Sequence, residues 1–421
     1  MRKRLILALL IVSFAVFTFA VTEIEFWHAM GGAQGTTVNE IVASFNEANP
    51  DILVKAIYVG NYSALQQKLL VSAESKTLPA LSQAYGNWTA RLIPRDAVQE
   101  LNSLISDPEV GLTDEEWDAI WNPFKKMVTW GDTVYALPFN KSTYVLYYNT
   151  DLFEQYGLEV PKTMDDLLFA AMMLTEDKNN DGQIDQYGFG FRTTIDHFMI
   201  FLRANGGEAI DIKPDGSVEV TINSPEAKEA LQLMYDMAHT YNVALFQGGY
   251  LDAPFGDGQI AMFVETIASA SYVDSGSRGK HGWAWAPVPM WKVQAPPFAG
   301  TDVVMFKGIS PEQKAAAWKF MKYLISPEIQ AYWSVKTGYM PVTEIALTTP
   351  QWKAYEEQNP TVMVPISQIP YGSVDPNVAL WDDVRNILGT MVGDVINQKR
   401  TVEEGLAWAE QEILLKVAEQ Q

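Results

Sequence analysis

The stretch VTEIEFWHAMGGAQG, residues 21–35, decides the fold class of this 421-residue chain. Residues 21–27 are rich in strand-forming side chains, with Ile24 and Phe26 on one face, and a glycine-rich turn follows at residues 31–35. A strand that ends in such a turn is typical of the first half of a strand–helix unit.

The unit continues with a helix and a second strand. Thr36 or Thr37 is predicted to cap a helix whose apolar residues recur at helical spacing until Asn49. A strand at 52–58 and another helix at 63–74 follow. This alternation of strands and helices predicts an α/β fold.

The rest of the chain predicts further elements of both kinds, and it contains no low-complexity linker. Ser310 and Gln313 have the spacing of a capping box. The expected elements are an extended stretch at 133–148 and helices at 164–174, from 225, at 311–325 and from 382 to the end. Two lobes joined by several crossings agree with this pattern better than two independent domains.

The first twenty residues predict export. A basic start, Arg2 to Arg4, precedes an apolar run at 5–17 and small residues before a cut after Ala20. The mature protein is expected to begin near Val21 and to work outside the cytoplasmic membrane, in the periplasm or an equivalent space. An uncleaved N-terminal anchor is the alternative.

Composition excludes several functions. The formal net charge of −21 repels nucleic acid and anionic lipid, so no nucleic-acid partner is expected. The absence of cysteine excludes disulfides, thiolate metal sites and a cysteine nucleophile. The four histidines lie in no metalloprotease or nucleophile-elbow motif, so the chain is not expected to be an enzyme. A secreted glycoside hydrolase is the alternative of a different class.

Residues 177–185, DKNNDGQID, match a calcium loop in part. Oxygen ligands stand at positions 1, 3, 5 and 9 and glycine at position 6, but Gly188 replaces the bidentate glutamate of position 12. The pattern predicts a structural Ca²⁺, with an acidic Asx-turn loop as the alternative. The ligands would come from Asp177, Asn179, Asp181, Gln183 and Asp185. No other cofactor is expected.

Two kinds of side chain point to a solute site. Ligands of open α/β sheets bind beyond the carboxyl ends of strands, where aromatic faces stack on sugars. Arg385 is one of few arginines, and its guanidinium suits two phosphate oxygens, although a salt bridge to Asp382 or Asp383 is the simpler interpretation of the spacing. The aromatic candidates at strand ends are Trp27, His28, Tyr62, Tyr85, Trp88 and Tyr339.

Eight short motifs then occur in order along essentially the whole mature chain. They are FWHAM at 26–30, FNEANP at 45–50, GNY at 60–62, PFNKS at 138–142, LYYN at 146–149, PKT at 161–163, FGDGQIAM at 255–262 and TGYMPV at 337–342. Together they resemble the periplasmic solute-binding proteins of carbohydrate-type ABC importers, and within that group the glycerol-phosphate-binding branch.

The resemblance implies a type II binding-protein fold, in which two α/β lobes close over a ligand about a hinge. It places residues 21–138 and 282–325 in an N-terminal lobe and residues 139–281 and 326–421 in a C-terminal lobe. It assigns the phosphate to Arg385, which reverses the salt-bridge interpretation. The ligand-binding residues that it implies are Tyr62, Ser142, Thr266, Gly300, Tyr339 and Arg385, with Trp27, His28, Tyr85 and Asn87 as weaker candidates.

Two departures from the family pattern affect the polyol end of the pocket. Gly86 stands where the family has an acidic residue that holds the glycerol hydroxyls, and Asn87 is the nearest polar substitute. Met164 stands where the family has a tryptophan. The predicted function is therefore capture of a glycerol-phosphate-type solute, either sn-glycerol 3-phosphate or a larger phosphodiester, with a mono- or oligosaccharide as the alternative. The expected partners are ABC permease subunits, and a monomer is expected.

Overall fold

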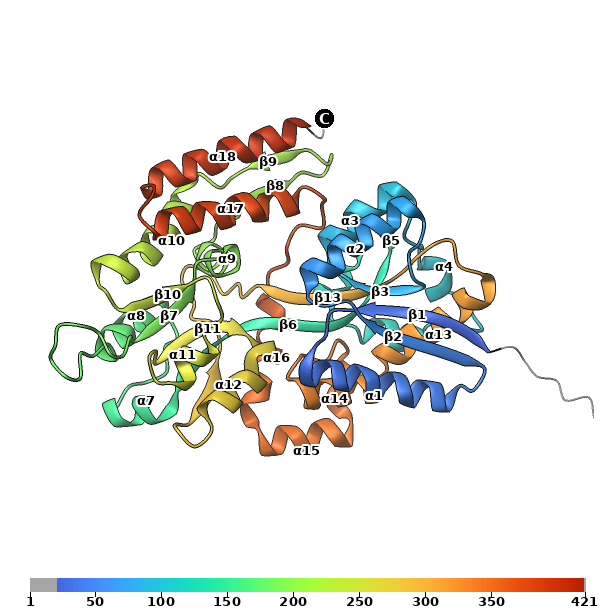
Figure 1. The fold of residues 1–421 in the computed structure, drawn as a ribbon, viewed down its shortest axis with the longest axis horizontal. Coiled ribbons are helices and arrows are strands. Elements are labelled where there is room, and N and C mark those ends of the chain that lie inside the picture. The colour runs from blue at the N-terminus through green and yellow to red at the C-terminus, as the bar shows by residue number, and fades with distance from the viewer. Residues whose placement is uncertain (1–20, 420–421) are drawn as a thin grey trace, which may run out of the picture.

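The computed structural model describes residues 21–419, in which strands and helices alternate (Figure 1). The predicted signal peptide at residues 1–20 lies outside the described residues. The strands are β1 (Thr22–His28), β2 (Ile52–Tyr58), β3 (Leu81–Ala84), β4 (Thr129–Trp130), β5 (Thr133–Val134), β6 (Ala136–Asn149), β7 (Phe189–Arg192), β8 (Ile210–Ile212), β9 (Val218–Val220), β10 (Ala244–Gln247), β11 (Met262–Thr266), β12 (Trp283–Ala286) and β13 (Phe298–Met305).

The helices cover the strands on both sides (Figure 1). They are α1 (Gly32–Ala48), α2 (Tyr62–Ser75), α3 (Gly86–Leu92), α4 (Asn102–Ile105), α5 (Asp114–Asp118), α6 (Asn122–Met127), α7 (Thr150–Tyr156), α8 (Met164–Met173), α9 (Ile195–Ala204), α10 (Pro225–Tyr235), α11 (Asp252–Gly256), α12 (Ala270–Ser277), α13 (Pro311–Ile325), α14 (Pro327–Thr337), α15 (Pro350–Gln358), α16 (Met363–Ser367), α17 (Trp381–Ile396) and α18 (Val402–Glu419). None of these helices has the length and apolarity that a membrane crossing requires.

One long mixed sheet runs through the molecule in the order β10-β7-β11-β6-β13-β3-β1-β2, with β12 also paired to β6. β1 is parallel to β2 and β3, and β7 is parallel to β10 and β11. Between these two parallel groups, β13 is antiparallel to both β3 and β6. Each parallel group therefore ends in its own set of loops, and the antiparallel strands connect the groups.

β6 is the strand that joins the two groups. Residues 136–143 of β6 pair with β13, whereas residues 144–149 pair with β11 and β12. Figure 1 shows β6 and β13 running across the middle of the molecule. The extended stretch predicted at 133–148 thus forms a continuous connection between the two halves of the sheet.

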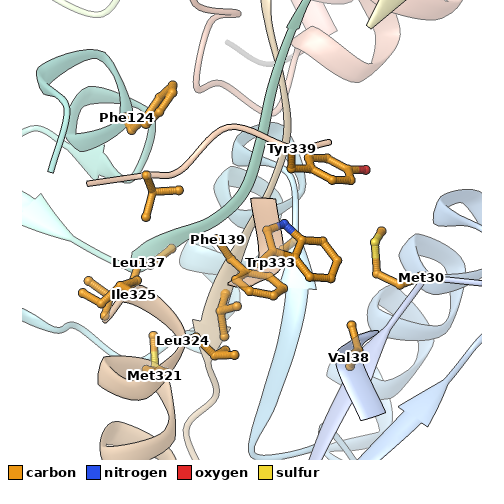
Figure 2. Close-up of a cluster of buried hydrophobic side chains, with 14 of the residues drawn as sticks. Met30, Val38, Phe124, Leu137, Phe139, Met321, Leu324, Ile325, Trp333 and Tyr339 are labelled. Atoms are coloured by element: carbon orange, nitrogen blue, oxygen red, sulfur yellow. The ribbon is translucent and has the colours of Figure 1, made fainter. Parts of the chain in front are cut away.

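The buried apolar side chains form two separate clusters. One gathers around β1, β3 and helices α1, α13 and α14 and extends along β6 to α11, β11 and α12, and the other gathers around β7, α9, α10, α17 and α18. Figure 2 shows part of the first cluster, where Trp333 of α14 packs against Phe139 of β6 with ring centroids 5.0 Å apart. Two cores along one sheet leave room for a site where they meet.

The first predicted helix starts earlier than the sequence indicates. α1 begins at Gly32, and the hydroxyls of Thr36 and Thr37 donate to the carbonyls of Gly32 and Ala33 within the helix. The prediction that one of these threonines caps the helix is therefore wrong, because the glycine-rich turn is itself the first turn of the helix. The capping box predicted at Ser310 and Gln313 is confirmed, and the Ser224 side chain caps α10.

Candidate functional site

A cavity of about 940 Å³ lies between the two halves of the sheet. That volume is near the upper end of about 300–1,000 Å³ for small-molecule sites. Its wall takes side chains from α2 and α3 on one side and from α9 and α17 on the other. The predicted ligand-binding residues Tyr62, Tyr85, Asn87, Ser142, Thr266, Gly300, Tyr339 and Arg385 all line this cavity.

Aromatic rings form one end of the cavity. The ring centroids of Tyr62 and Tyr85 are 5.2 Å apart, and those of Tyr85 and Trp88 are 4.9 Å apart, both edge to face. Tyr339 packs on Trp333 at the edge of the first core, with ring centroids 5.4 Å apart (Figure 2). Burial raises the pKa of the Tyr62, Tyr85 and Tyr339 hydroxyls, so all three remain neutral hydrogen-bond donors.

A buried amide network fixes Tyr62. The side-chain amide of Asn140 donates to the Tyr62 hydroxyl oxygen over 3.1 Å. The Asn140 carbonyl oxygen in turn accepts from Gln83 over 2.9 Å and from Thr301 over 2.6 Å. Because Asn140 and Thr301 lie on β6 and β13, the crossing strands set the orientation of a side chain on α2.

Three predicted residues lie on the strands that form the cavity floor. Ser142 of β6 is buried, and its hydroxyl has no hydrogen-bond partner among residues 21–419, so a ligand oxygen would satisfy it. Thr266 ends β11, where its carbonyl accepts from the Tyr147 hydroxyl over 2.9 Å. Gly300 has φ +94°, and a Cβ there would stand 1.9 Å from the Asn140 carbonyl oxygen, so only glycine is accommodated.

Arg385 has acidic partners, but not the predicted ones. Its Nη2 lies 2.7 Å from Asp196 Oδ1 and its Nη1 lies 3.4 Å from Asp375 Oδ2. The interpretation that pairs Arg385 with Asp382 or Asp383 is wrong, since both of those carboxylates contact Arg91 of α3 instead. Burial lowers the pKa of Arg385, but Asp196 and Asp375 outweigh it and raise the pKa.

Asp382 links the two sides of the cavity. Its carboxylate accepts from Gln66 of α2 over 3.0 Å, from the Asn87 amide, and from Arg91 Nε over 2.8 Å. The donors come from α2 and α3, whereas Asp382 lies in the first turn of α17. Asn87, a weaker ligand candidate, is therefore committed to this contact as well as lining the cavity.

Gly86 has a neighbour that explains the missing side chain. A Cβ at Gly86 would stand 2.2 Å from Oδ1 of Asn377. The Asn377 amide donates to the carbonyls of Met127 over 2.8 Å and Lys126 over 3.2 Å. The space that a larger residue at 86 would need is thus filled by a polar side chain from the segment before α17.

Two weaker candidates lie elsewhere. Trp27 and His28 are not among the residues that line the cavity. Trp27 donates to Glu25 over 2.8 Å, and the Lys68 ammonium lies 3.8 Å from its ring centroid. His28 is buried, and burial lowers its pKa to about 4, so it is neutral at physiological pH.

The 177–185 loop satisfies its own carboxylates with backbone donors. Asp177 Oδ2 accepts from the Gly182 amide over 2.8 Å, and Asp181 Oδ1 accepts from the Gln183 amide over 2.8 Å. Asn179 accepts in the same way from the Asp181 amide. Within residues 21–419, no group of three or more histidine, aspartate or glutamate side chains is arranged to hold a metal.

Several polar residues of the cavity were not predicted. Arg192 pairs with buried Glu265, whose pKa burial would raise but His197 and Arg192 hold below its usual range. Arginine is scarce in this chain, and its scarcity drew attention to Arg385. The same signal could have pointed to Arg91, Arg192 and Arg203. The unpredicted charged residues of the wall are Arg91, Arg192, Asp196, Arg203, Asp252, Glu265, Asp375, Asp382 and Asp383.

Comparisons with known proteins find matches over most of the chain. The model of a family described as bacterial extracellular solute-binding protein matches residues 40–361. The sn-glycerol-3-phosphate-binding periplasmic protein UgpB of Yersinia pestis is 27% identical over 377 residues, which cover 86% of this chain and 83% of that protein.

Solved structures share the fold at lower identity. UgpB from Mycobacterium tuberculosis in complex with glycerophosphocholine has a TM-score of 0.82 at 19% identity, and the match covers 94% of this chain and 99% of that one. The GacH receptor of Streptomyces glaucescens, solved unliganded and with acarbose, has a TM-score of 0.80 at 19% identity, with coverage of 94% and 99%. The predicted two-lobe α/β binding-protein fold is therefore confirmed.

Proposed function

Because the chain belongs to the bacterial extracellular solute-binding protein family, we propose that its cavity captures a glycerol-phosphate-type solute for an ABC importer. The family consists of binding proteins, so the chain binds a solute and is not an enzyme, as the sequence predicts. The solute class is supported by the relatives named above and by the chemistry of the cavity.

The observation that carries the proposal is the position of Arg385 in the same cavity as Ser142, Tyr62 and Tyr339. A guanidinium presents paired donors to phosphate oxygens, and the neutral hydroxyls donate to the remaining oxygens. The aromatic end receives the carbon chain of the solute. Closure over the solute would exclude water and strengthen each of these hydrogen bonds.

Binding and closure are coupled in this proposal. A solute that contacts Tyr62 of α2 and Arg385 of α17 binds most tightly when the two sides of the cavity approach each other. The predicted lobes, residues 21–138 with 282–325 and residues 139–281 with 326–421, would be the moving bodies. Helix α14 packs against α1, and Figure 2 shows Trp333 and Val38 in the same cluster, so the start of the last segment would move with the N-terminal lobe.

A saccharide remains the second candidate, because the aromatic end suits sugar rings and the cavity exceeds what a three-carbon phosphate needs. In either case the protein would work outside the cytoplasmic membrane as a monomer. It would deliver its solute to membrane permease subunits of an ABC importer.

Isothermal titration of the mature protein tests the proposal. We expect micromolar or tighter binding of sn-glycerol 3-phosphate or glycerophosphocholine, and weaker or no binding of maltose. Binding of maltose without either phosphate compound would keep the transport role and replace the solute. Glycoside hydrolysis by the same preparation would contradict the assignment as a binding protein.

A structural Ca²⁺ in the 177–185 loop stays a prediction. If it binds, Ca²⁺ should raise the melting temperature of chelator-treated protein, and Asp181→Asn should abolish that increase. Asp215→Asn, in an exposed turn where Asp215 accepts from the Ser217 amide over 3.0 Å, is the matched control. An identical melting temperature with and without Ca²⁺ would leave the loop as an Asx-turn structure.

A further inference from the structure

Arg203 of α9 is a second arginine in the cavity wall, and it shares a partner with Arg385. Its side chain is 1% exposed. Arg203 Nη1 lies 3.0 Å from Asp375 Oδ1, and Arg385 Nη1 lies 3.4 Å from Asp375 Oδ2. Two guanidinium groups therefore hold the two oxygens of one carboxylate.

The donor set of Arg203 is incomplete. Its Nε bonds Glu208 Oε1 over 2.9 Å, but its Nη2 is buried with no hydrogen-bond partner in the described part of the chain. A buried donor without a partner is costly, most of all in a charged group. The site as it stands thus has a spare donor next to a carboxylate that two arginines already share.

Asp375 lies outside the helices and strands, unlike the two arginines that bind it. Arg203 and Arg385 extend from helices, whereas Asp375 lies in the segment between Tyr371 and α17, where Ser373 forms an isolated bridge with Pro297. The Asp375 side chain is 35% exposed. Trp381 Nε1 also donates to its Oδ2 over 2.9 Å. The carboxylate can move without breaking a helix or a sheet ladder.

A carboxylate between two guanidinium groups presents negative charge and two acceptor oxygens to them, and a phosphate can make the same bidentate contacts. We propose that Asp375 occupies the anion position of the cavity before the solute arrives. The phosphate of the solute then displaces the Asp375 carboxylate and binds Arg203 and Arg385 in its place. The inference rests on the proposed function only in its choice of a phosphate-bearing solute. A neutral sugar would leave Asp375 in place.

Removing the charge of Asp375 should therefore favour phosphate. We expect Asp375→Asn to tighten binding of sn-glycerol 3-phosphate and of inorganic phosphate about tenfold, because a competing charge-assisted contact is lost. Asp394→Asn is the matched control, since it removes the same charge from α17 outside the cavity, where Asp394 pairs with Lys399 and Arg400. It should change affinity by less than about threefold. Asp375→Glu, which keeps the carboxylate, should not tighten binding.

Calorimetric titration of the four mature proteins at one ionic strength separates the outcomes, with melting temperatures recorded for each. Wild-type binding of sn-glycerol 3-phosphate with equal effects of Asp375→Asn and Asp394→Asn would overturn the displacement and leave the proposed function standing. If the wild type does not bind sn-glycerol 3-phosphate and only Asp375→Asn binds inorganic phosphate, the displacement is supported and the proposed solute is rejected. No gain by Asp375→Asn with either probe would overturn the displacement.

Discussion

Arg385 has two roles that a substitution can separate. Its guanidinium neutralises Asp196 and Asp375, and in the proposal it also binds phosphate. Replacing it leaves those carboxylates facing the cavity, where they repel an anion. The consequence differs for a charged and a neutral solute.

We expect Arg385→Ala to weaken binding of the phosphate solute at least about a hundredfold, because two charge-assisted contacts are lost. Arg95→Ala is the control, because Arg95 pairs with Glu74 on the exposed surface. Calorimetric titration measures both. Retained affinity in Arg385→Ala would favour a saccharide as the solute.

Gly86 and Asn377 should behave as a coupled pair. Gly86→Ala places a methyl group against the hydrogen-bonded Asn377 amide, and overpacking of this kind costs about 1–3 kcal/mol. Adding Asn377→Ala opens that space, so the double variant should lose less stability than the sum of the single variants. Thermal unfolding of the four proteins measures the coupling. Additive losses would show that the close approach is not what selects glycine.

At this scale the sequence predicted the positions facing the cavity better than their partners. Tyr62 and Ser142 belong to motifs of the resemblance, and Arg385 was identified by the scarcity of arginine and by the same resemblance. Asp196 and Asp375 lie about 190 and 10 residues from Arg385, and only the fold brings them together. Contacts of that kind follow from three-dimensional geometry, which local spacing does not contain.

Among the elements, the contact between α17 and the pair α2 and α3 joins the two sides of the cavity. Asp382 at the start of α17 accepts three side-chain donors from across the cavity. All of them depend on one carboxylate. The contact is therefore specific to the arrangement in which the two sides touch.

Asp382→Ala should favour the open arrangement. We expect a larger radius of gyration in small-angle scattering, and about tenfold weaker solute binding because closure brings fewer bonds. Asp394→Ala is the matched control, since it removes the same charge from the same helix where Asp394 pairs with Lys399 and Arg400. Equal scattering from both variants would show that Asp382 does not hold the two sides together.

Element types could be predicted from the sequence, and some boundaries could not. The Ser310 capping box predicts the start of α13 because the cap is a local interaction. α1 starts four residues before the earlier of its two predicted caps, since the helix extends through a glycine-rich turn that propensity alone assigns to a loop. Tertiary packing overrides propensity there.

At the scale of the whole molecule, a buried ion pair joins the neighbouring strands β6 and β13, which run between the two halves of the sheet. Lys141 Nζ is 2.6 Å from Asp302 Oδ1, and the two side chains are 0% and 3% exposed. Burial raises the pKa of Asp302 to about 6, although Lys141 opposes this, and burial lowers the pKa of Lys141. The charged pair therefore lies in a place that favours neutral groups.

The sign of the pH dependence follows. Asp302 binds its proton more tightly in the folded protein, so its contribution to the free energy of unfolding falls as pH rises from about 4 to about 6. Because burial lowers the pKa of Lys141, its contribution to the free energy of unfolding rises as the pH rises toward the ordinary lysine pKa of 10.5. Denaturant unfolding of wild type and Asp302→Asn across pH 4–7 measures the acid window. If the free energy of unfolding changed with pH equally in wild type and in Asp302→Asn, the raised pKa of Asp302 would be contradicted.

Removing one charge should harm the protein more than removing both. Asp302→Asn at pH 7 leaves a buried ammonium and should cost about 3–5 kcal/mol of unfolding free energy. The Lys141→Met and Asp302→Leu double variant should lie between neutral and about 4 kcal/mol more stable than wild type. Guanidinium unfolding measures both. A double variant less stable than Asp302→Asn would show that the pair itself holds the crossing together.

The position of β13 has a consequence for how the chain acquires its structure. β13 lies between β3 and β6, so residues 81–84 have no completed neighbour on that side until residue 305 has been made. Pairings this distant in sequence form slowly. A ribosome adding residues from the N-terminus therefore produces more than two thirds of the protein before the long sheet can be completed. Until β13 has been made, one edge of β3 lacks its partner strand, and the group of β1, β2 and β3 is not joined to β6.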